Sequence, residues 1–327
     1  MKIAIIGAGA IGGLLGARLA LAGEDVTFVV RGANLQAIGE HGIKLIEADG
    51  REQVARNVRA TNDYRAAGAH DLVVLAMKAH QLGAVAAQVP LLCGPDTVVV
   101  PMQNGIPFWY FHKLAGPFEG RTLDSVDPGG AIGRAIAPER VIGCVVYPAS
   151  ELVAPGVVRH IEGDRFPLGE LDGSTSARAQ RVSDAFVRSG LKAPLLADIR
   201  SEIWLKLWGN LVFNPVSALT RATLADICRF APTRELSALM MAEAQQVATK
   251  LGVTFRVSID KRIAGAERVG AHKTSMLQDV EAGREPEIEA LIGSVAELAR
   301  LTATPTPHID TVYALTRLLA RGVTAAA

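Results

Sequence analysis

The chain opens with KIAIIGAGAIG, residues 2–12, and this stretch decides the fold of its first half. KIAIIG is a short apolar run that ends in glycine, and Gly7, Gly9 and Gly12 then follow the spacing GxGxxG. The residues after Gly12 are typical of a helix, and DVTFVV at 25–30 is typical of the next strand. Together these segments predict a βαβ unit of about 30 residues, the context in which the glycine spacing indicates dinucleotide binding.

Each glycine of this turn has a physical role. Gly7 permits a tight turn, Gly9 lets the backbone approach a pyrophosphate, and Gly12 lets the helix pack closely on the strand. The N-terminus of the helix then offers free N–H groups and a partial positive charge to the phosphates. The alternative is a glycine-rich turn of an unrelated α/β protein, but the strands on both sides favour a nucleotide. The predicted cofactor-binding turn consists of Gly7, Ala8, Gly9, Ala10, Ile11 and Gly12.

The residue after the second strand indicates which cofactor binds. NAD enzymes usually place an acid there, which holds the ribose 2′-hydroxyl. In this chain the strand is followed by Arg31, and no acid occupies the position. A guanidinium favours a 2′-phosphate through paired, charge-assisted hydrogen bonds. The sequence therefore predicts NADP(H); the alternative is a solvated surface arginine, since such a loop is normally polar.

Two further apolar runs end in polar residues. DLVVLAM at 71–77 is followed by Lys78, and TVVVPM at 97–102 is followed by QNG, which contains Asn104. Near-continuous apolar runs are typical of parallel strands covered on both faces, and such sheets bind ligands at the carboxyl ends of their strands. We therefore predict that Lys78 contacts the cofactor and that Asn104 contacts the cofactor or the substrate. The alternatives are a lysine at a helix start and an ordinary Asn-Gly turn.

The rest of the chain divides into two parts. Short strands are predicted at 141–149, 156–163 and 165–170, extending the sheet in antiparallel fashion, with a helix at 176–190 and a strand at 192–198. The sequence thus predicts an α/β fold, with a Rossmann domain over 1–198 and an all-helical domain over 199–327. The helices are expected near 199–213, 216–229, 232–251, 258–270, 275–282, 286–301 and 307–321, bounded in part by Pro215, Pro232, Pro286 and Pro305.

Composition excludes several classes of partner. With 49% hydrophobic and 20% charged residues, the chain has the profile of a soluble globular protein. Its 34 basic and 33 acidic residues are balanced, which predicts neither nucleic acid nor an anionic membrane as partner. Three distant cysteines fit no zinc spacing and no disulfide framework, so we expect no metal and a cytoplasmic location. The apolar N-terminus resembles a signal peptide, but its glycines and Arg18 argue against one.

The second half contains an unusual helix, WLKLWGNLVFNP at 204–215. Lys206, Asn210 and Asn214 stand four residues apart and form one slanted stripe. The other positions are apolar apart from Gly209, which indicates a helix buried nearly all round. The alternative is the solvated edge of a surface helix. We predict instead that the stripe lines a cleft and holds an anionic, carbonyl-bearing small molecule.

A second polar set lies at 274–290, TSMLQDVEAGREPEIEA. Ser275 and Glu287 are its candidate site residues. Each has a structural alternative, because Ser275 with Gln278 matches a capping box, and Glu287 after Pro286 matches an acid in the first turn of a helix. Sequence spacing alone does not bring Glu287 to Lys206.

These motifs resemble those of the ketopantoate reductases (2-dehydropantoate 2-reductases), in the same order and over nearly the whole chain. The specific part is the combination of WxKLxxNxxxNP with SMLQD and a following EIE. The resemblance implies a Rossmann domain followed by a helical domain of the 6-phosphogluconate dehydrogenase C-terminal type. It also implies NADPH-dependent reduction of ketopantoate to pantoate, a step of pantothenate and coenzyme A biosynthesis.

The resemblance also implies roles for individual residues. Lys206 matches the family's catalytic lysine, and Glu287 matches the acid that hydrogen-bonds the reacting oxygen and orients the substrate. The implied substrate contacts are Asn210, Asn214 and Ser275. The implied cofactor-side positions are Gly7, Gly9, Gly12, Arg31, Lys78 and Asn104.

Two departures from the family pattern leave the exact 2-keto acid open. The segment Ile106–Tyr110 after the QNG motif is bulkier than in better-known members, and Glu289 stands where the family often has aspartate. The alternatives are a paralogous dehydrogenase for another keto or hydroxy acid, and a non-catalytic NADP-binding sensor. The expected small-molecule partner is a 2-keto acid. The helix with Met240 and Met241 and the C-terminal helices fit a core or a homodimer interface equally well, so the sequence leaves the oligomeric state open.

Overall fold

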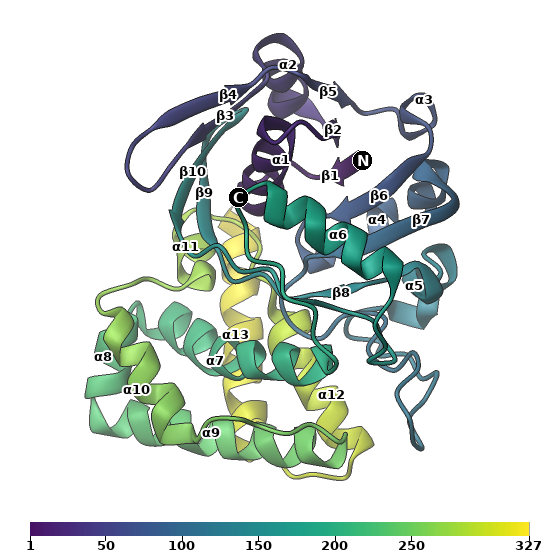
Figure 1. The fold of residues 1–327 in the computed structure, drawn as a ribbon. Coiled ribbons are helices and arrows are strands. Elements are labelled where there is room, and N and C mark those ends of the chain that lie inside the picture. Colours follow the sequence, from purple (N-terminus) through teal and green to yellow (C-terminus); the bar gives the residue numbers. More distant parts are fainter. Residues whose placement is uncertain (327) are drawn as a thin grey trace. The chain divides into compact units, whose positions relative to one another are not determined.

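The computed structural model describes residues 1–326, which form two compact units (Figure 1). The first unit comprises residues 1–103, 108–122 and 127–199. The second comprises residues 104–107, 123–126 and the chain from residue 200 onward. The division expected after residue 198 stays a prediction. Two short segments from the first half of the chain belong to the second unit, which no sequence pattern indicates.

The first unit is built on a sheet of five parallel strands. Its members are β1 (Lys2–Ile6), β2 (Asp25–Val29), β5 (Val58–Thr61), β6 (His70–Leu75) and β7 (Cys93–Pro101). The spatial order is β5-β2-β1-β6-β7, and each neighbouring pair runs parallel. Counted along the chain, this is the order 3-2-1-4-5 of a Rossmann fold. The predicted Rossmann fold is confirmed, although β5 was not predicted.

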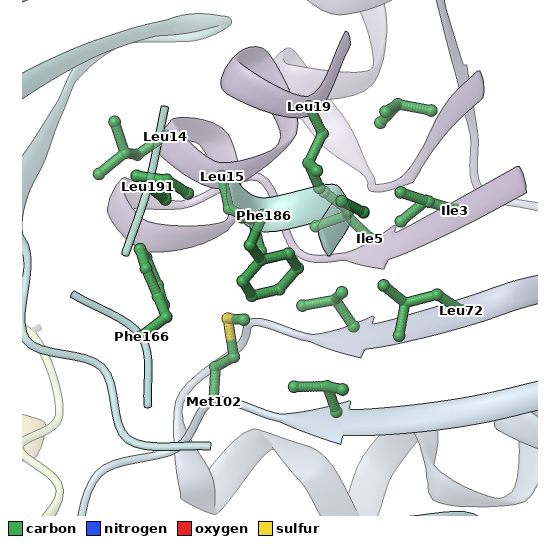
Figure 2. Close-up of a cluster of buried hydrophobic side chains, with 14 of the residues drawn as sticks. Ile3, Ile5, Leu14, Leu15, Leu19, Leu72, Met102, Phe166, Phe186 and Leu191 are labelled. Carbon is green, nitrogen blue, oxygen red and sulfur yellow. The ribbon is translucent and has the colours of Figure 1, made fainter. Parts of the chain in front are cut away.

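Helix α1 (Ala10–Leu21) packs between two sheets because one glycine faces each of them. A Cβ on Gly16 would lie 2.3 Å from the ring of Phe28 in β2, and a Cβ on Gly13 would lie 2.4 Å from Val158 in β10 (Val157–Glu162). The leucines of α1 fill the core beside the strands, as Figure 2 shows for Leu14, Leu15 and Leu19 with Ile3, Ile5 and Leu72. The core thus fixes the helix whose first turn would bind phosphates.

The second sheet has four strands in the order β4-β3-β10-β9. They are β3 (Ile43–Ile46), β4 (Glu52–Ala55), β9 (Ala149–Ala154) and β10 (Val157–Glu162). The predicted antiparallel extension of the main sheet by residues 141–170 is therefore wrong. β9 and β10 pair antiparallel with each other, but β10 then pairs in parallel with β3, which was not predicted as a strand. Strands this short carry little information about their partners.

The remaining segments of the first unit are short. β8 (Gly143–Cys144) and β11 (Leu168–Gly169) form a two-stranded sheet, and 192–198 forms isolated bridges rather than the predicted strand. Helix α6 (Ala177–Arg188) occupies the range predicted for a helix at 176–190. The other helices are α2 (Gly32–His41), α3 (Tyr64–Ala67), α4 (Leu82–Val85) and α5 (Ala131–Ala135), with 3₁₀ turns at Ala79–Gln81, Ala86–Leu92, Pro128–Gly130 and Pro138–Arg140.

The second unit is helical, and residues 200–326 contain no strand. Its helices are α7 (Ile199–Thr220), α8 (Leu224–Arg229), α9 (Ala231–Lys250), α10 (Ile259–Val269), α11 (Ser275–Glu281), α12 (Ser294–Leu301) and α13 (Pro307–Ala326). A π-helical segment, Glu289–Gly293, precedes α12. None of the described helices combines the length and the apolar character needed to cross a membrane.

The expected break at Pro215 is wrong. α7 continues through Pro215 to Thr220, and α8 covers only the end of the helix predicted at 216–229. Proline inside a helix removes one backbone N–H and typically costs about 3 kcal/mol. Burial offsets this cost, because Leu211, Phe213 and Val216 are each at most 3% exposed and each buried side chain contributes roughly 1.5–3 kcal/mol.

Candidate active site

The glycine turn of the first unit has the geometry of a phosphate-binding turn. Gly7 has φ +96°, and its N–H donates to the carbonyl of Val29. Gly9 stands at the N-cap of α1, where an added Cβ would meet no protein atom within 4 Å. A Cβ on Gly12 would lie 2.0 Å from the carbonyl oxygen of Gly7, so only glycine allows this approach of helix to turn.

The surroundings of this turn also suit an anion. The first turn of α1 carries no acidic residue, and no side chain caps its N-terminus. Ala8 is buried, and Ala10 and Ile11 are half-buried. Asn34 supports the turn, since its amide nitrogen lies 3.4 Å from the carbonyl of Ala8 and its amide oxygen accepts from the N–H of Gly156. The residues present therefore fit a dinucleotide pyrophosphate. Asn34 was not predicted as a supporting residue, because its two contacts span 26 and 122 residues.

Arg31 directly follows β2, and its side chain is exposed at the start of α2. It lies close enough to Tyr64 to act on it electrostatically. Burial raises the pKa of the Tyr64 hydroxyl, and the charge of Arg31 acts in the opposite direction. An exposed cation at this strand end fits the predicted 2′-phosphate, and the segment 31–34 contains no acidic residue.

Lys78 lies half-buried just beyond β6, at the start of a 3₁₀ turn where its backbone N–H donates to the side chain of Gln81. Gln103, which precedes Asn104, holds this edge of the sheet together. Its amide nitrogen donates to the carbonyls of Leu75 and Met77 at 2.9 and 3.0 Å. The sequence offered only one signal for Gln103, its place in the QNG motif.

In the second unit, α7 carries the polar stripe that the sequence predicts. Lys206 and Asn210 are half-buried, and Asn214 is only 5% exposed. Most of the side chains around the stripe are apolar and buried, including Trp204 and Trp208, both 0% exposed. A solvated helix edge does not fit such burial, because the amides and the ammonium are largely removed from bulk water.

The stripe meets Asn104. The ammonium Nζ of Lys206 donates a hydrogen bond to Asn104 Oδ1 at 2.7 Å, the short length of a charge-assisted bond. The turn interpretation of the QNG motif also holds, since Gly105 has φ +87°. Asn104 therefore does more than form a turn: it brings an amide oxygen to the lysine of the stripe.

Ser275 and Glu287 lie in the same unit. The capping-box interpretation of Ser275 is wrong, because Thr274 is the N-cap of α11 and its hydroxyl accepts from the N–H of Leu277. Ser275 is the exposed first residue of that helix. Glu287 is half-buried and directly precedes Ile288, where the next helical segment begins. Contact between Glu287 and Lys206 stays a prediction.

Gly209, the remaining break in the apolar pattern of α7, faces Arg262 of α10. A Cβ on Gly209 would lie 2.1 Å from Nη2 and 2.9 Å from Cζ of that arginine. Glycine thus leaves room for a guanidinium against α7, one turn from Lys206. Arg262 was not predicted, because an isolated arginine in a polar helix carries no distinguishing pattern.

Two family models match the chain. Residues 3–173 match ketopantoate reductase PanE/ApbA, and residues 198–320 match the C-terminal part of ketopantoate reductase PanE/ApbA. The chain belongs to the ketopantoate reductase family. Membership makes it an oxidoreductase, and the predicted enzyme class is confirmed.

Known proteins align with nearly the full length of the chain. A 2-dehydropantoate 2-reductase of Mesorhizobium japonicum is 56% identical over 321 residues, which is 98% of each chain. A ketopantoate reductase-like protein of Ralstonia solanacearum MolK2 has a solved structure with a TM-score of 0.94, 44% identity and 98% coverage of each chain. D-mandelate dehydrogenase, solved with NADH and anilino(oxo)acetate, shares the fold at a TM-score of 0.84, 24% identity and 99% coverage of each chain.

The two departures from the family pattern have structural roles in this ketopantoate reductase family member. Phe108, Trp109, Tyr110 and Phe111 are each at most 8% exposed and pack inside the first unit. The bulky segment is therefore core. A cavity of about 270 Å³ lies beside it, and none of the predicted site residues lines that cavity; its lining is Phe108, Trp109, His112, Gly120, Arg121, Thr122, Asp127, Gly129, Gly130, Gly133, Arg134 and Pro138.

Glu289 is engaged by α13. Its carboxylate accepts from the hydroxyl of Tyr313 at 2.6 Å, and Arg317 Nε lies 3.7 Å away. Burial, with the hydrogen bond and charge of Glu289, raises the pKa of Tyr313 to about 12. Gly293 makes room for this pair, since its Cβ would lie 2.3 Å from Glu289 Oε2. The longer acid thus links the π-helical segment to α13.

Proposed function

We propose that this protein reduces 2-dehydropantoate (ketopantoate) to pantoate with NADPH, a step of pantothenate biosynthesis. The observation that carries the proposal is the hydrogen bond from Lys206 to Asn104, within a stripe of amides on an otherwise apolar helix. The 56% identical relative, a 2-dehydropantoate 2-reductase, supports the choice of substrate. A carboxylate-bearing ketone needs both an ammonium at its carbonyl and neutral donors along its polar edge.

Lys206 is the proposed proton donor. When bound, the reduced nicotinamide supplies the hydride to the ketone carbon. Lys206 stabilises the negative charge that develops on the ketone oxygen and delivers the proton to it. The amide oxygen of Asn104 holds the ammonium of Lys206 in position by accepting its 2.7 Å hydrogen bond. The result is a 2-hydroxy acid.

The other polar residues bind and orient the substrate in this proposal. Asn210, Asn214 and Ser275 hold its carboxylate and hydroxyl groups. Glu287 hydrogen-bonds the reacting oxygen and, as a carboxylate, favours the charged form of Lys206. The phosphate groups of the cofactor bind at the glycine turn, with Arg31 and Lys78 as the cationic contacts.

The reaction is tested by following NADPH absorbance with purified protein and a panel of 2-keto acids. Ketopantoate is expected to give the highest kcat/KM. Lys206→Ala is expected to lower kcat about 10²- to 10⁴-fold, the range for losing a positioned acid. Lys261→Ala, an exposed lysine of α10, is the matched control. Near-normal kcat in Lys206→Ala would refute the role, and tight NADPH binding without any turnover would favour the sensor.

The preference for NADPH is proposed from Arg31. Arg31→Ala is expected to raise the KM for NADPH about 10-fold or more while changing the KM for NADH little, because only NADPH carries the 2′-phosphate that pairs with the guanidinium. Arg56→Ala removes another exposed arginine of the same unit and serves as control. A wild-type preference for NADH would contradict the proposal.

A homodimer is also proposed, as a state to be measured by sedimentation or light scattering. Met240 and Met241 are both 0% exposed and belong to the core of the helical unit, so they do not supply an interface. Exposed Leu315 and Leu318 on α13 are the apolar positions that a second copy would cover. A monomer at all concentrations would refute the proposed homodimer.

We further propose a cytoplasmic location.

A further inference from the structure

The carbonyl oxygen of Ala290 receives two hydrogen bonds from groups other than the helical backbone ladder. The N–H of Ile106 donates to it at 3.0 Å, and the hydroxyl of Ser294 donates at 2.8 Å. Ala290 lies within the π-helical segment Glu289–Gly293. Such segments are rare, usually a single turn, and frequent at functional sites. A carbonyl of this turn thus becomes an anchor for a segment that lies about 180 residues earlier in the chain.

Gly105 makes this anchor possible. Its φ is +87°, in the left-handed region that disfavours side chains, and a Cβ there would lie 2.0 Å from the oxygen and 2.5 Å from the carbon of the Ala290 carbonyl. Two independent constraints, conformation and space, therefore require glycine at this position. Carbonyl atoms of a buried helix cannot rotate away as a flexible side chain can.

The anchored residues adjoin Asn104. Gly105 packs against the Ala290 carbonyl and Ile106 hydrogen-bonds to it, so the two residues after Asn104 are fixed to the helical unit. Ile106 is also 1% exposed, which adds burial to the hydrogen bond. Asn104 itself is half-buried and accepts the hydrogen bond from Lys206. The position of its amide therefore depends on how closely its neighbours approach Ala290.

We propose that Gly105 and the Ala290 carbonyl form a clamp that positions Asn104 against Lys206, and so holds the proton-donating ammonium in place. Gly105, Ala290 and Ser294 act as positioning residues in this scheme, since the acting contact is the one between Asn104 and Lys206. The inference rests on the proposed role of Lys206. It adds that the π-helical turn exists to present one carbonyl to the segment that carries Asn104.

A double-mutant cycle tests the clamp. Gly105→Ala and Asn104→Ala are each expected to lower kcat at saturating substrate by about 10- to 150-fold, the effect of losing a hydrogen bond to a charged group. The double variant is expected to fall no further than Asn104→Ala alone, because both changes remove the same contact. NADPH affinity is expected to change in Gly105→Ala no more than in Asn104→Ala, since the glycine turn that binds the phosphates belongs to the first unit.

The matched control is Gly50→Ala. Gly50 has the same φ of +87° but an added Cβ would meet nothing within 4 Å, so it reports backbone strain without the clash. It is expected to lower stability slightly and to leave kcat unchanged. If the losses of Gly105→Ala and Asn104→Ala multiply, or if Gly105→Ala retains wild-type kcat, the clamp is refuted while the role of Lys206 stands. Wild-type kcat in Lys206→Ala would instead refute the proposed function.

A second variant keeps the test open should Gly105→Ala fail to fold. Ser294→Ala removes one donor to the Ala290 carbonyl without adding an atom. Ser294→Ala is expected to lower kcat by less than about tenfold. The double variant Ser294→Ala/Asn104→Ala is expected to have the same kcat as Asn104→Ala alone. No loss at all, or a loss that persists in that background, overturns the clamp.

Discussion

Two glycines of the phosphate-binding turn, Gly9 and Gly12, should respond differently to the same substitution: only Gly12→Ala should lower stability. In Gly12→Ala the methyl carbon would stand 2.0 Å from the carbonyl oxygen of Gly7, and would have to retreat by about 1.4 Å to reach the 3.4 Å of ordinary contact. Overpacking of this kind costs about 1–3 kcal/mol, and the better helix propensity of alanine returns up to about 1 kcal/mol. Because the obstacle is backbone, we expect a net loss of about 2 kcal/mol, or roughly 4–8 °C in Tm.

In Gly9→Ala the added methyl meets no protein atom, and φ of −76° suits alanine. Stability is therefore expected within about 0.5 kcal/mol of wild type. The methyl would instead occupy the space through which the backbone approaches a pyrophosphate, so the Kd for NADPH should rise at least about tenfold.

Thermal unfolding and NADPH fluorescence titration on both variants separate the two effects. Gly12→Ala is expected to lower Tm and to weaken NADPH, while Gly9→Ala weakens NADPH only. Gly39→Ala, where a Cβ also meets nothing within 4 Å, controls for the substitution itself. A Gly9→Ala protein that binds NADPH as wild type does, or a Gly12→Ala protein of unchanged Tm, would refute the assigned roles.

Two further predictions concern stability. Arg178→Met leaves the 4% exposed carboxylate of Glu170 without its ion pair and should cost about 3 kcal/mol near neutral pH, at the low end for broken buried pairs because Arg178 is 31% exposed. Burial opposes the ionisation of Glu170, but hydrogen bonds from Arg178 and Ser176 outweigh it and hold the pKa below 4.5. A carboxyl whose pKa is lower in the folded than in the unfolded protein stabilises the fold at pH values above its unfolded pKa. The difference in urea midpoint between wild type and Arg178→Met should therefore shrink as the pH falls below about 4.5. A difference that stays constant with pH would contradict this cause. Gly209→Ala should leave the free energy of unfolding within about 1 kcal/mol of wild type, because the atoms that the new methyl meets are the end of the flexible Arg262 side chain. A loss of stability as large as that of Gly12→Ala would show that Arg262 is rigid.

The parts of the fold that the sequence predicted are those whose signals are local. β1, the glycine turn, α1 and β2 follow one another within 29 residues, and each has its own pattern of apolar residues and glycine. β6 and β7 are long apolar runs because helices and loops cover both faces of a parallel sheet. α6 has a serine cap and a clear polar face. In all these elements, neighbours in the sequence are also neighbours in the structure.

The second sheet could not be predicted because its information is spread over the chain. β3 and β4 have four residues each, and β4 reads EQVA, which has no apolar run. β10 pairs with β3 across more than 110 residues, and the packing of Val158 against Gly13 of α1 supports that pairing. Short, half-polar strands fit several partners equally well, so the tertiary contact decides among them.

Pro215 failed as a boundary for a similar reason. The rule that proline ends a helix weighs one lost hydrogen bond against local alternatives. In α7 the lost hydrogen bond is opposed by tertiary packing, because the helix is buried on nearly every side. Ending the helix at residue 213 would expose Val216 and Ala218, which are 3% and 1% exposed. A local rule carries no information about the burial that opposes it.

The candidate site shows how two ambiguous patterns can resolve each other. Asn104 alone fits an ordinary turn, and Lys206 alone fits the polar edge of a helix. The hydrogen bond between them joins residues 102 apart, and it requires Gly105 to lie against a carbonyl in a third segment of the chain. No pairwise pattern in the sequence encodes such a three-part contact, because each part is an unremarkable local motif. The glycine of the QNG motif is required both by its turn conformation and by its packing against Ala290, so substitution there should reveal more about the site than substitution of either polar partner.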